Sequence, residues 1–257
     1  MNKEKKIKLS DLLLQKGYSK EESMGLILSG RIIVDGNRET RYGISVKTDA
    51  KIDILSLKKY VARSAEKLLG ALDDFRIDVS GRICVDLGSS SGGFVQVLLE
   101  RGAKKVYAVD VGYGILDYSL RMDARVVVLE RHNVRQIDSS WFLDEDMEII
   151  RNGNSGSLLI TCDVSFMSIR TVLKALSSFL AANNIQSEGV YLIKPQFEDS
   201  KNTEEGILAD ENLRKKIVDD AVAHALMLGF ECRGVLPARI RGSSGNQEFV
   251  IHLTFSG

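Results

Sequence analysis

The sequence predicts an α/β protein with a Rossmann-like, mostly parallel sheet, an antiparallel last strand and a small α+β domain at the N-terminus. Three observations predict this class. Strands and helices alternate from Arg82 onward, a loop of small residues follows the first apolar strand, and a turn-rich loop rather than a helix joins the last two strands. A length of 257 residues accommodates one such domain and a small appendage.

Apolar runs of strand length recur through the larger part of the chain, with amphipathic segments between them. The expected strands cover residues 83–87, 106–111, 125–129, 157–162, 190–193, 231–236 and 248–255. The expected helices include residues 64–72, a segment that ends at Arg101, and residues 169–180 and 211–228. This alternation predicts a doubly wound sheet with right-handed crossovers.

The formal net charge of zero is an average over two unlike parts. Residues 1–63 carry 14 Lys+Arg against 8 Asp+Glu, or +6, whereas the remainder carries 21 against 27, or −6. A basic head on an acidic body is typical of a phosphate-binding module attached to an enzyme core. A solvated basic surface without a partner gives the same count.

Targeting, membrane and metal signals are weak in this chain. The lysine-rich start leads into a short amphipathic run, and no stretch approaches the roughly 18 apolar residues of a membrane-spanning helix. Cys84, Cys162 and Cys232 stand singly, without metal-ligand spacing, and we expect three buried reduced thiols. We therefore expect a cytoplasmic protein without a membrane partner or a bound metal.

The sequence of the first 54 residues predicts two short helices followed by a compact hairpin. One helix starts after Lys8, and a second starts at Ser19 with Glu22 three positions on, as in a capping box. Residues 31–34 alternate as a strand, Asp35 and Gly36 supply the hairpin turn, and residues 44–54 predict further short strands.

Residues 7–54 resemble the small RNA-binding domain of the ribosomal protein S-four type, through their leucine pattern, the segment 30–36 and Gly43. The resemblance implies RNA contacts for Lys8, where the family usually has Arg, and for Arg31; Arg63, at the end of the basic linker, is a further candidate RNA contact. We expect this domain at residues 1–57, a basic linker at 58–63 and the larger domain at 64–257. A helix-hairpin module for dimerisation or packing is the alternative.

The segment 85–94 ends a strand, makes a tight turn of small residues and opens a helix, so a ligand can approach the backbone. About 20 residues later, Asp110 ends the second strand, where a carboxylate accepts both hydroxyls of a ribose. The pattern predicts a nucleoside site. Its candidate residues are Asp86, Gly88, Ser89, Ser90, Gly92, Gly93, Phe94, Asp110 and Asn133.

The composition of this loop favours S-adenosylmethionine as the cofactor. A phosphate loop of the Walker type would place Lys and then Ser or Thr after the glycines, where Phe94 and Val95 stand. The carboxylate of Asp86 suits the ammonium of a methionine moiety better than a pyrophosphate, and the loop 132–134 is expected at the adenine. In the alternative interpretation, Asp86 only caps the glycine turn.

Five segments of the larger domain resemble the TlyA family of ribosomal RNA 2′-O-methyltransferases, whose catalytic domain is of the FtsJ type. They are residues 60–68, 86–94, 163–166, 193–198 and 245–249. The resemblance implies a Rossmann-like S-adenosylmethionine-dependent methyltransferase domain and, as its substrate, a cytidine 2′-hydroxyl in ribosomal RNA or ribosomal subunits. The usual glycine after the Arg of the first segment is Ser64 here, and residues 89–91 read Ser-Ser-Ser where Ala-Ser-Thr is more common.

The catalytic tetrad of that family corresponds to Lys67, Asp163, Lys194 and Glu248. A ribose hydroxyl is a weak nucleophile, so an enzyme must align the oxygen and assist the loss of its proton. Lys194 is the candidate base, or the cation that stabilises a developing alkoxide. Asp163 would orient Lys194, and Lys67 and Glu248 would complete the charge network. Taken singly, each residue also suits a surface or capping role.

Three other functions compete with this hypothesis. The name haemolysin, long attached to the family, suggests a membrane-lytic protein, but the sequence contains no apolar span and no strongly cationic amphipathic helix. An RNA-binding protein with an inactive methyltransferase domain and a small-molecule methyltransferase with an incidental basic appendage are the others.

Overall fold

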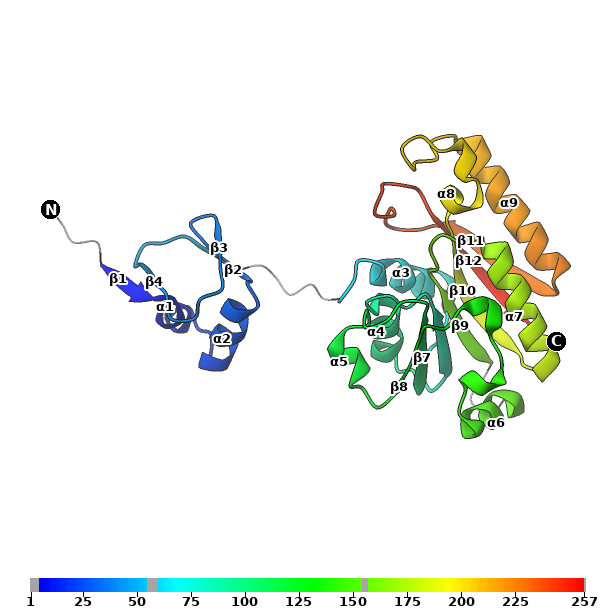
Figure 1. Cartoon of the computed structure of the whole chain (residues 1–257), viewed down its shortest axis with the longest axis horizontal. Helices are drawn as coiled ribbons and strands as arrows, with labels where there is room; N and C mark the ends of the chain where they lie inside the picture. Colours follow the sequence, from blue (N-terminus) through cyan, green and yellow to red (C-terminus); the bar gives the residue numbers. More distant parts are fainter. Residues whose placement is uncertain (1–4, 55–59, 154–156, 257) are drawn as a thin grey trace. The chain divides into compact units, whose positions relative to one another are not determined.

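The computed structural model describes residues 5–54, 60–153 and 157–256. The chain divides into two compact units, Met1–Lys59 and Tyr60–Gly257 (Figure 1). Of the expected linker 58–63, residues 58 and 59 lie outside the described residues. Tyr60 is buried in the second unit, and the backbone N–H of Val61 donates to the side chain of Gln96 at 2.9 Å. The described end of the linker therefore packs against the second unit.

The first unit contains the two helices and the hairpin that its sequence predicts. Ser19 caps α2 through the expected capping box: its Oγ accepts from the N–H of Glu22 at 3.1 Å, and the Glu22 carboxylate accepts from the N–H of Ser19 at 2.7 Å. Asp35 and Gly36 adopt positive φ, 47° and 83°, which suits a two-residue hairpin turn. The elements are α1 (Leu9–Gln15), α2 (Lys20–Leu28), β2 (Ile32–Val34), β3 (Asn37–Glu39), β4 (Ser45–Lys47) and β5 (Ile52–Ile54).

One strand of the first unit is missing from the sequence-based prediction. β1 (Lys6–Lys8) pairs antiparallel with β4, while β2 pairs with both β3 and β5. Three residues that alternate Lys-Ile-Lys are too short to signal a strand by periodicity, so only the pairing with β4 defines this element. The core beneath these strands consists of Leu9, Leu12, Leu13, Ile27, Ile32 and Val46.

The second unit is built on a seven-stranded sheet of order β11-β12-β10-β9-β6-β7-β8. β12 runs antiparallel to both of its neighbours, and the other pairs are parallel, which confirms the expected antiparallel last strand. The strands are β6 (Ile83–Leu87), β7 (Lys105–Asp110), β8 (Val126–Glu130), β9 (Leu158–Cys162), β10 (Ser187–Ile193), β11 (Phe230–Pro237) and β12 (Phe249–Phe255).

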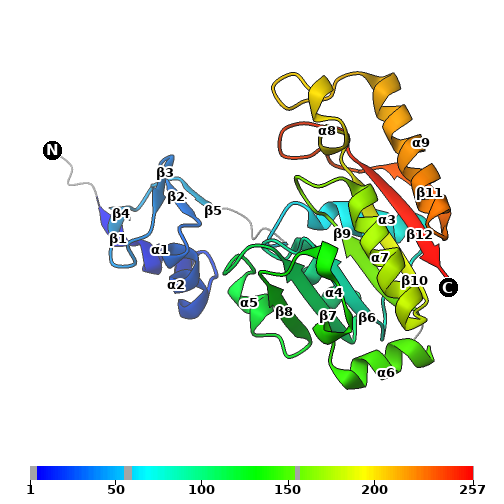
Figure 2. The same ribbon diagram turned by 45° about the vertical axis from the view of Figure 1, so that its right-hand side comes forward.

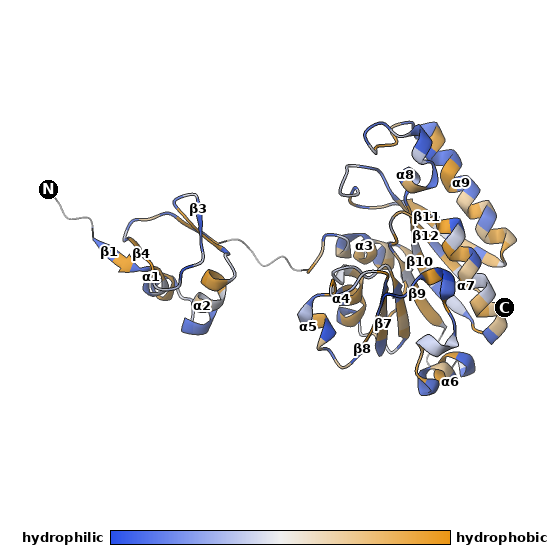
Figure 3. Ribbon diagram, in the orientation of Figure 1, coloured by the Kyte–Doolittle hydropathy of each residue, from blue (hydrophilic) through white to orange (hydrophobic). Residues whose placement is uncertain are grey.

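Helices cover both faces of this sheet (Figure 2). Figure 3 shows apolar strands between helices that carry both hydrophobic and hydrophilic residues, as expected for a three-layer protein. One face carries α3 (Ala65–Phe75), α4 (Gly93–Glu100) and α5 (Tyr118–Arg121), and the other carries α6 (Asp144–Asn152), α7 (Ile169–Asn183) and α9 (Glu211–Met227). The short elements are α8 (Pro195–Glu198), η1 (Val134–Gln136), η2 (Ser139–Trp141) and η3 (Ser200–Asn202).

Most predicted elements of this unit are confirmed, and the exceptions are short or poorly signalled. The helix expected at 64–72 continues to Phe75, and α6 was not expected. Cys84 and Cys162 are buried and free, but the prediction for Cys232 was wrong because this residue, on the edge strand β11, is only partly buried.

The loops after β6 and β9 begin side by side at the carboxyl edge of the sheet. Leu87 lies opposite Cys162 in the parallel register, and the N–H of Asp163 donates to the carbonyl of Leu87 at 3.0 Å. The chain crosses from β6 to β7 on one side and reaches β9 on the other, so this is the topological switch point of the sheet. Ligands of open α/β sheets bind at such a point.

A charged cluster near the amino ends of the strands lies away from that edge. Arg82 donates to Glu188 at 2.5 Å and to the carbonyl of Ser157, and Nε2 of His252 lies 2.8 Å from the other carboxylate oxygen of Glu188. The hydrogen bonds from His252 and Arg82 lower the pKa of Glu188 to about 2. This carboxylate therefore holds β10 to β12 and to the start of β6.

We expect the cluster to make stability depend on pH. Because the folded pKa of Glu188 lies below its unfolded value, its contribution is complete above about pH 4.5 and is lost as pH falls toward 2. Glu188→Gln should lower the free energy of unfolding by about 2 kcal/mol at pH 7 and by much less near pH 3. Urea denaturation at both pH values tests this, with the exposed Glu231→Gln as control; an equal loss at both values would contradict the assignment.

Candidate active site

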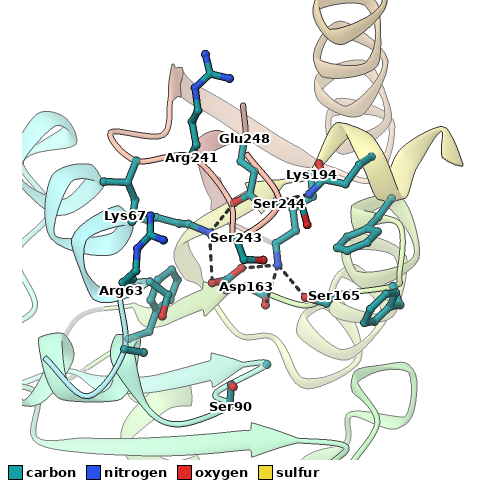
Figure 4. Close-up of a pocket in the computed structure, with 18 of the residues that line it drawn as sticks. Arg63, Lys67, Ser90, Asp163, Ser165, Lys194, Arg241, Ser243, Ser244 and Glu248 are labelled. Atoms are coloured by element: carbon teal, nitrogen blue, oxygen red, sulfur yellow. Dashed lines mark hydrogen bonds and ion pairs between the residues drawn. The ribbon is translucent and has the colours of Figure 1, made fainter. Parts of the chain in front are cut away.

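Four charged side chains from distant parts of the sequence meet at the carboxyl edge of the sheet (Figure 4). Lys194 Nζ lies 2.6 Å from Asp163 Oδ1, and Lys67 Nζ lies 2.6 Å from Glu248 Oε2. Asp163 Oδ2 lies 4.0 Å from Lys67 Nζ and so joins the two pairs. The structure therefore brings together all four residues that the sequence singled out as a tetrad.

The tetrad alternates in charge and is largely removed from water. Lys67 stands in the first turn of α3, Asp163 follows β9, Lys194 follows β10, and Glu248 directly precedes β12. The exposed fractions are 7% for Lys67, 8% for Lys194 and 3% for Glu248. Buried charges are tolerated only when each one is paired, so the order Lys194, Asp163, Lys67, Glu248 makes each carboxylate compensate a neighbouring ammonium.

Two polar residues extend the tetrad and were not assigned a role from the sequence. Ser165 Oγ accepts from Lys194 Nζ at 3.0 Å, and Gln196 Nε2 donates to Glu248 Oε1 at 3.3 Å. Both lie in segments that carried the family resemblance, but a spacing does not show which way a loop side chain points. Ser165 orients the Lys194 ammonium, and Gln196 fixes the carboxylate of Glu248.

The loop between β11 and β12 forms one wall of the site and is firmly anchored. Asn246 is 2% exposed; its Oδ1 accepts from the N–H of Leu208 at 3.0 Å, and its Nδ2 donates to the carbonyl of Gly206 at 2.8 Å. A Cβ at Gly242 would lie 2.4 Å from Glu248 Oε1. The absence of a side chain at Gly242 therefore lets the loop close over the buried carboxylate.

Two cavities adjoin the tetrad and share part of their walls. The larger one, of about 650 Å³, is lined by all four tetrad residues, and the smaller one, of about 240 Å³, runs along the ends of β6 and β7. The shared wall consists of Gly88, Ser90, Asp163, Ser165 and Phe166. The volume of the larger cavity lies in the range of small-molecule and cofactor sites, and the smaller cavity extends it.

Most of the expected cofactor residues lie at these cavities. Ser89 and Phe94 line the larger cavity, and Asp110 lines the smaller one. Gly88 adopts φ +83°, and a Cβ there would approach the backbone of Asp163 to 3.0 Å. Gly92 and Gly93 line neither cavity; added Cβ atoms there would meet Leu120 or the start of α3, so both serve close packing of the loop.

Asp110 has a structural role that the sequence did not suggest. Its Oδ2 accepts from the N–H of Ser90 at 2.8 Å, and its Oδ1 accepts from the N–H of Gly112 at 2.7 Å. The carboxylate thus ties the loop after β6 to the loop after β7. Each oxygen retains a further lone pair for a ligand hydroxyl.

Two further expected cofactor residues, Asp86 and Asn133, line neither cavity. Asp86 is wholly buried, its Oδ1 accepts from Thr161 at 2.8 Å, and it lines neither cavity; burial raises its pKa to about 8. Its other oxygen, Oδ2, is buried and has no hydrogen-bond partner among the described residues. Asn133 accepts from the N–H of Arg135 at 3.1 Å as the cap of η1, whereas its neighbours His132 and Val134 line the smaller cavity.

The expected RNA-contacting residues fall in both units. Lys8 is exposed and Arg31 half-buried in the first unit, whereas Arg63 is exposed at the wall of the larger cavity. Within residues 5–54, 60–153 and 157–256, no group of three or more His, Cys, Asp or Glu is placed to hold a metal ion. The same residues contain no helix long and apolar enough to cross a membrane.

The sheet order, in which antiparallel β12 separates β10 from β11, and the tetrad at the carboxyl ends of the strands define a Rossmann-like methyltransferase. The family model of the FtsJ-like methyltransferases matches residues 60–255, and the chain belongs to this family.

Sequence similarity to known relatives extends over most of the chain. It is 36% identical over 250 residues to Hemolysin A of Brachyspira hyodysenteriae, covering 96% of this chain and 99% of that protein. It is 38% identical over 240 residues to the 16S/23S rRNA (cytidine-2′-O)-methyltransferase TlyA of Mycobacterium tuberculosis, covering 91% of this chain and 84% of that protein. A crystal structure from Lactococcus lactis, of a protein provisionally named a hemolysin, has a TM-score of 0.69 and 37% identity, covering 77% of this chain and 89% of that one.

We expect strong energetic coupling between Lys67 and Glu248. Lys67→Met leaves a buried carboxylate without its cation and should cost about 3 kcal/mol of unfolding free energy. Adding Glu248→Gln should restore more than half of that loss. Urea denaturation of the single and double variants measures the coupling, and additive losses would show that the pair is not coupled. In the exposed pair with Asp73, Arg101→Met should cost less than about 1 kcal/mol.

Proposed function

We propose that this protein transfers a methyl group from S-adenosylmethionine to the 2′-hydroxyl of a ribose, in a cytidine of ribosomal RNA. The observation that carries the proposal is the alternating tetrad of Lys194, Asp163, Lys67 and Glu248, which lines the larger cavity and reaches the wall shared with the smaller one through Asp163. The name of the Mycobacterium tuberculosis relative supplies the nucleotide and the RNA class. The enzyme would act in the cytoplasm on ribosomal RNA or on ribosomal subunits.

The two cavities fit the parts of S-adenosylmethionine. The smaller one combines apolar walls, among them Val134 and Met167, with the carboxylate of Asp110, which suits an adenine and a ribose diol. The larger one offers the polar wall of Ser89 and Ser90 to the amino-acid part. When bound, the cofactor supplies a methyl group already activated by a sulfonium charge.

The residues of the chain then have to align the hydroxyl and manage its proton. Lys194 is the group that accepts this proton or stabilises the developing alkoxide, held by Asp163 at 2.6 Å and Ser165 at 3.0 Å. Lys67 lies 4.0 Å from Oδ2 of Asp163, the oxygen that does not contact Lys194, and so holds this carboxylate in place. Glu248 in turn holds Lys67 at 2.6 Å. Positioning and charge stabilisation together account for the expected acceleration.

The first unit supplies RNA affinity in this proposal, as a domain of the S-four type. Helices α1 and α2 and the strands β2 and β4 supply its small separate core, and Lys8 is exposed on its surface. Contacts through Lys8 and Arg31 would read the shape and phosphate pattern of folded RNA rather than its sequence.

Removal of the Lys194 amine should abolish most activity without unfolding the protein. Lys194→Ala is expected to lower the rate of methyl transfer to ribosomal RNA by roughly 10²- to 10⁴-fold, because the hydroxyl loses its proton acceptor or its charge stabiliser. Transfer of labelled methyl from S-adenosylmethionine, followed by mapping of the 2′-O-methylated nucleotide, measures this. Lys174→Ala, at an exposed lysine of α7, serves as the matched control.

Lys194→Arg separates the two roles of Lys194, because arginine keeps the charge but does not act as a base near neutral pH. Partial activity would favour charge stabilisation, and none would favour a base. An unmodified ribose with methyl on the nucleobase, or no transfer by the wild type, would contradict the proposal; the latter would favour an inactive RNA-binding protein.

The cofactor assignment predicts a role for Asp110 in affinity. Asp110→Asn should weaken S-adenosylmethionine binding by about tenfold or more, because a ribose diol loses a charged acceptor. Calorimetric titration with the cofactor measures this, and Asp117→Asn, which alters a helix cap outside both cavities, is the control. Unchanged affinity would place the ribose elsewhere.

A further inference from the structure

The wall of the larger cavity carries more positive than negative charge. Its charged residues are Arg63, Lys67, Asp163, Lys194, Arg241 and Glu248, or four cations against two carboxylates. The two lysines and the two carboxylates compensate one another within the tetrad. The surplus of +2 therefore belongs to Arg63 and Arg241, although residues 64–257 as a whole are acidic.

These two arginines come from different elements that border the same cavity. Arg63 precedes α3, and Arg241 stands on the loop between β11 and β12; Figure 4 shows Arg63 beside Lys67 and Arg241 at the margin of the site. Both are exposed, and in the described part of the chain neither forms an ion pair with a carboxylate. An exposed, uncompensated guanidinium at the mouth of an active site is available to an anion.

Arg241 is held in place rather than freely swinging. Its Nη1 donates to the carbonyl of Gly245 at 3.0 Å, and Asn246 anchors the same loop to Gly206 and Leu208. One of its five N–H donors is used in this way, which leaves the others for a ligand. A pre-positioned guanidinium loses less conformational entropy on binding than a free one.

We propose that Arg63 and Arg241 form a phosphate clamp that binds the phosphodiester groups flanking the target nucleotide. The inference rests on the proposed function, because it takes RNA as the ligand. Phosphate oxygens match the planar fork of arginine, and contacts to the backbone position a strand without reading its sequence. Such a clamp would hold the ribose over the tetrad while Lys194 acts on its hydroxyl.

A second anion competes for the same groups, namely the carboxylate of S-adenosylmethionine. It has the same bidentate chemistry, and Ser89 and Ser90 line the same cavity as both arginines. Separate measurements of RNA and cofactor affinity distinguish the two sources. We assign the clamp to RNA because Arg63 and Arg241 are both exposed at the margin of the site.

The test uses the full chain with Arg63→Gln, Arg241→Gln and the double variant. Affinity for a fluorescent single-stranded RNA is measured by anisotropy at several KCl concentrations, and cofactor affinity by calorimetry. Each substitution should weaken RNA binding about tenfold at low salt and reduce the slope of log affinity against log salt by about 0.7. Cofactor affinity should stay unchanged. Arg233→Gln, an exposed arginine of β11 that pairs with Glu231 at 2.7 Å, is the matched control.

The outcomes separate the clamp from the proposed function. Unchanged RNA affinity and slope in the double variant would overturn the clamp even if the wild type methylates ribosomal RNA. A loss of cofactor affinity instead would assign the arginines to the methionine carboxylate and equally overturn it. A lower slope without any methyl transfer by the wild type would support the clamp while the proposed function fails. In methylation assays, the clamp predicts a raised KM for RNA with kcat largely retained.

Discussion

The site depends on one interaction, the chain of alternating charges that runs from Lys194 through Asp163 and Lys67 to Glu248. Withdrawing four charges from water costs several kcal/mol per ion, and their mutual attraction repays this only when every member is paired. A buried network of this kind adds little net stability compared with apolar packing. Its presence in the second unit therefore points to a chemical role rather than to a role in stability, and the surrounding fold has to hold four separate elements in place to form it.

The fold holds the tetrad in place because each of its residues lies in or directly beside a regular helix or strand. Asp163 and Lys194 directly follow buried parallel strands, and Glu248 directly precedes a strand that runs antiparallel beside β10. The reversed direction of β12 is what brings the start of that strand to the carboxyl edge, where Glu248 can reach Lys67. Gly242 then permits the preceding loop to close over the carboxylate, and Asn246 fixes that loop.

The sequence predicted the parts of this site that regular structure determines. Strand ends carry Asp110, Asp163 and Lys194 to one edge, so apolar periodicity and sheet topology suffice to bring them near one another. Side-chain direction in irregular segments is decided by local hydrogen bonds instead. Asn133 caps the short helix η1 and does not line the cavity. Asp86 lies in β6 directly before the loop, as expected, but one of its oxygens accepts from Thr161 in the core, which no spacing reveals.

The net charge of zero hides a local difference within the second unit, whose composition is acidic but whose larger cavity has a positively charged wall. A neutral total argues against binding of an anionic polymer, and the acidic composition of residues 64–257 argues against it more strongly. A pocket responds to the charges that line it, however, since a low-dielectric wall screens them less than water does. Because the tetrad is internally neutral, Arg63 and Arg241 alone set the sign at the mouth of the pocket. In the proposed clamp, the acidic remainder would limit nonspecific adhesion of RNA elsewhere on the unit, so that productive contact would be confined to the pocket and to the basic first unit.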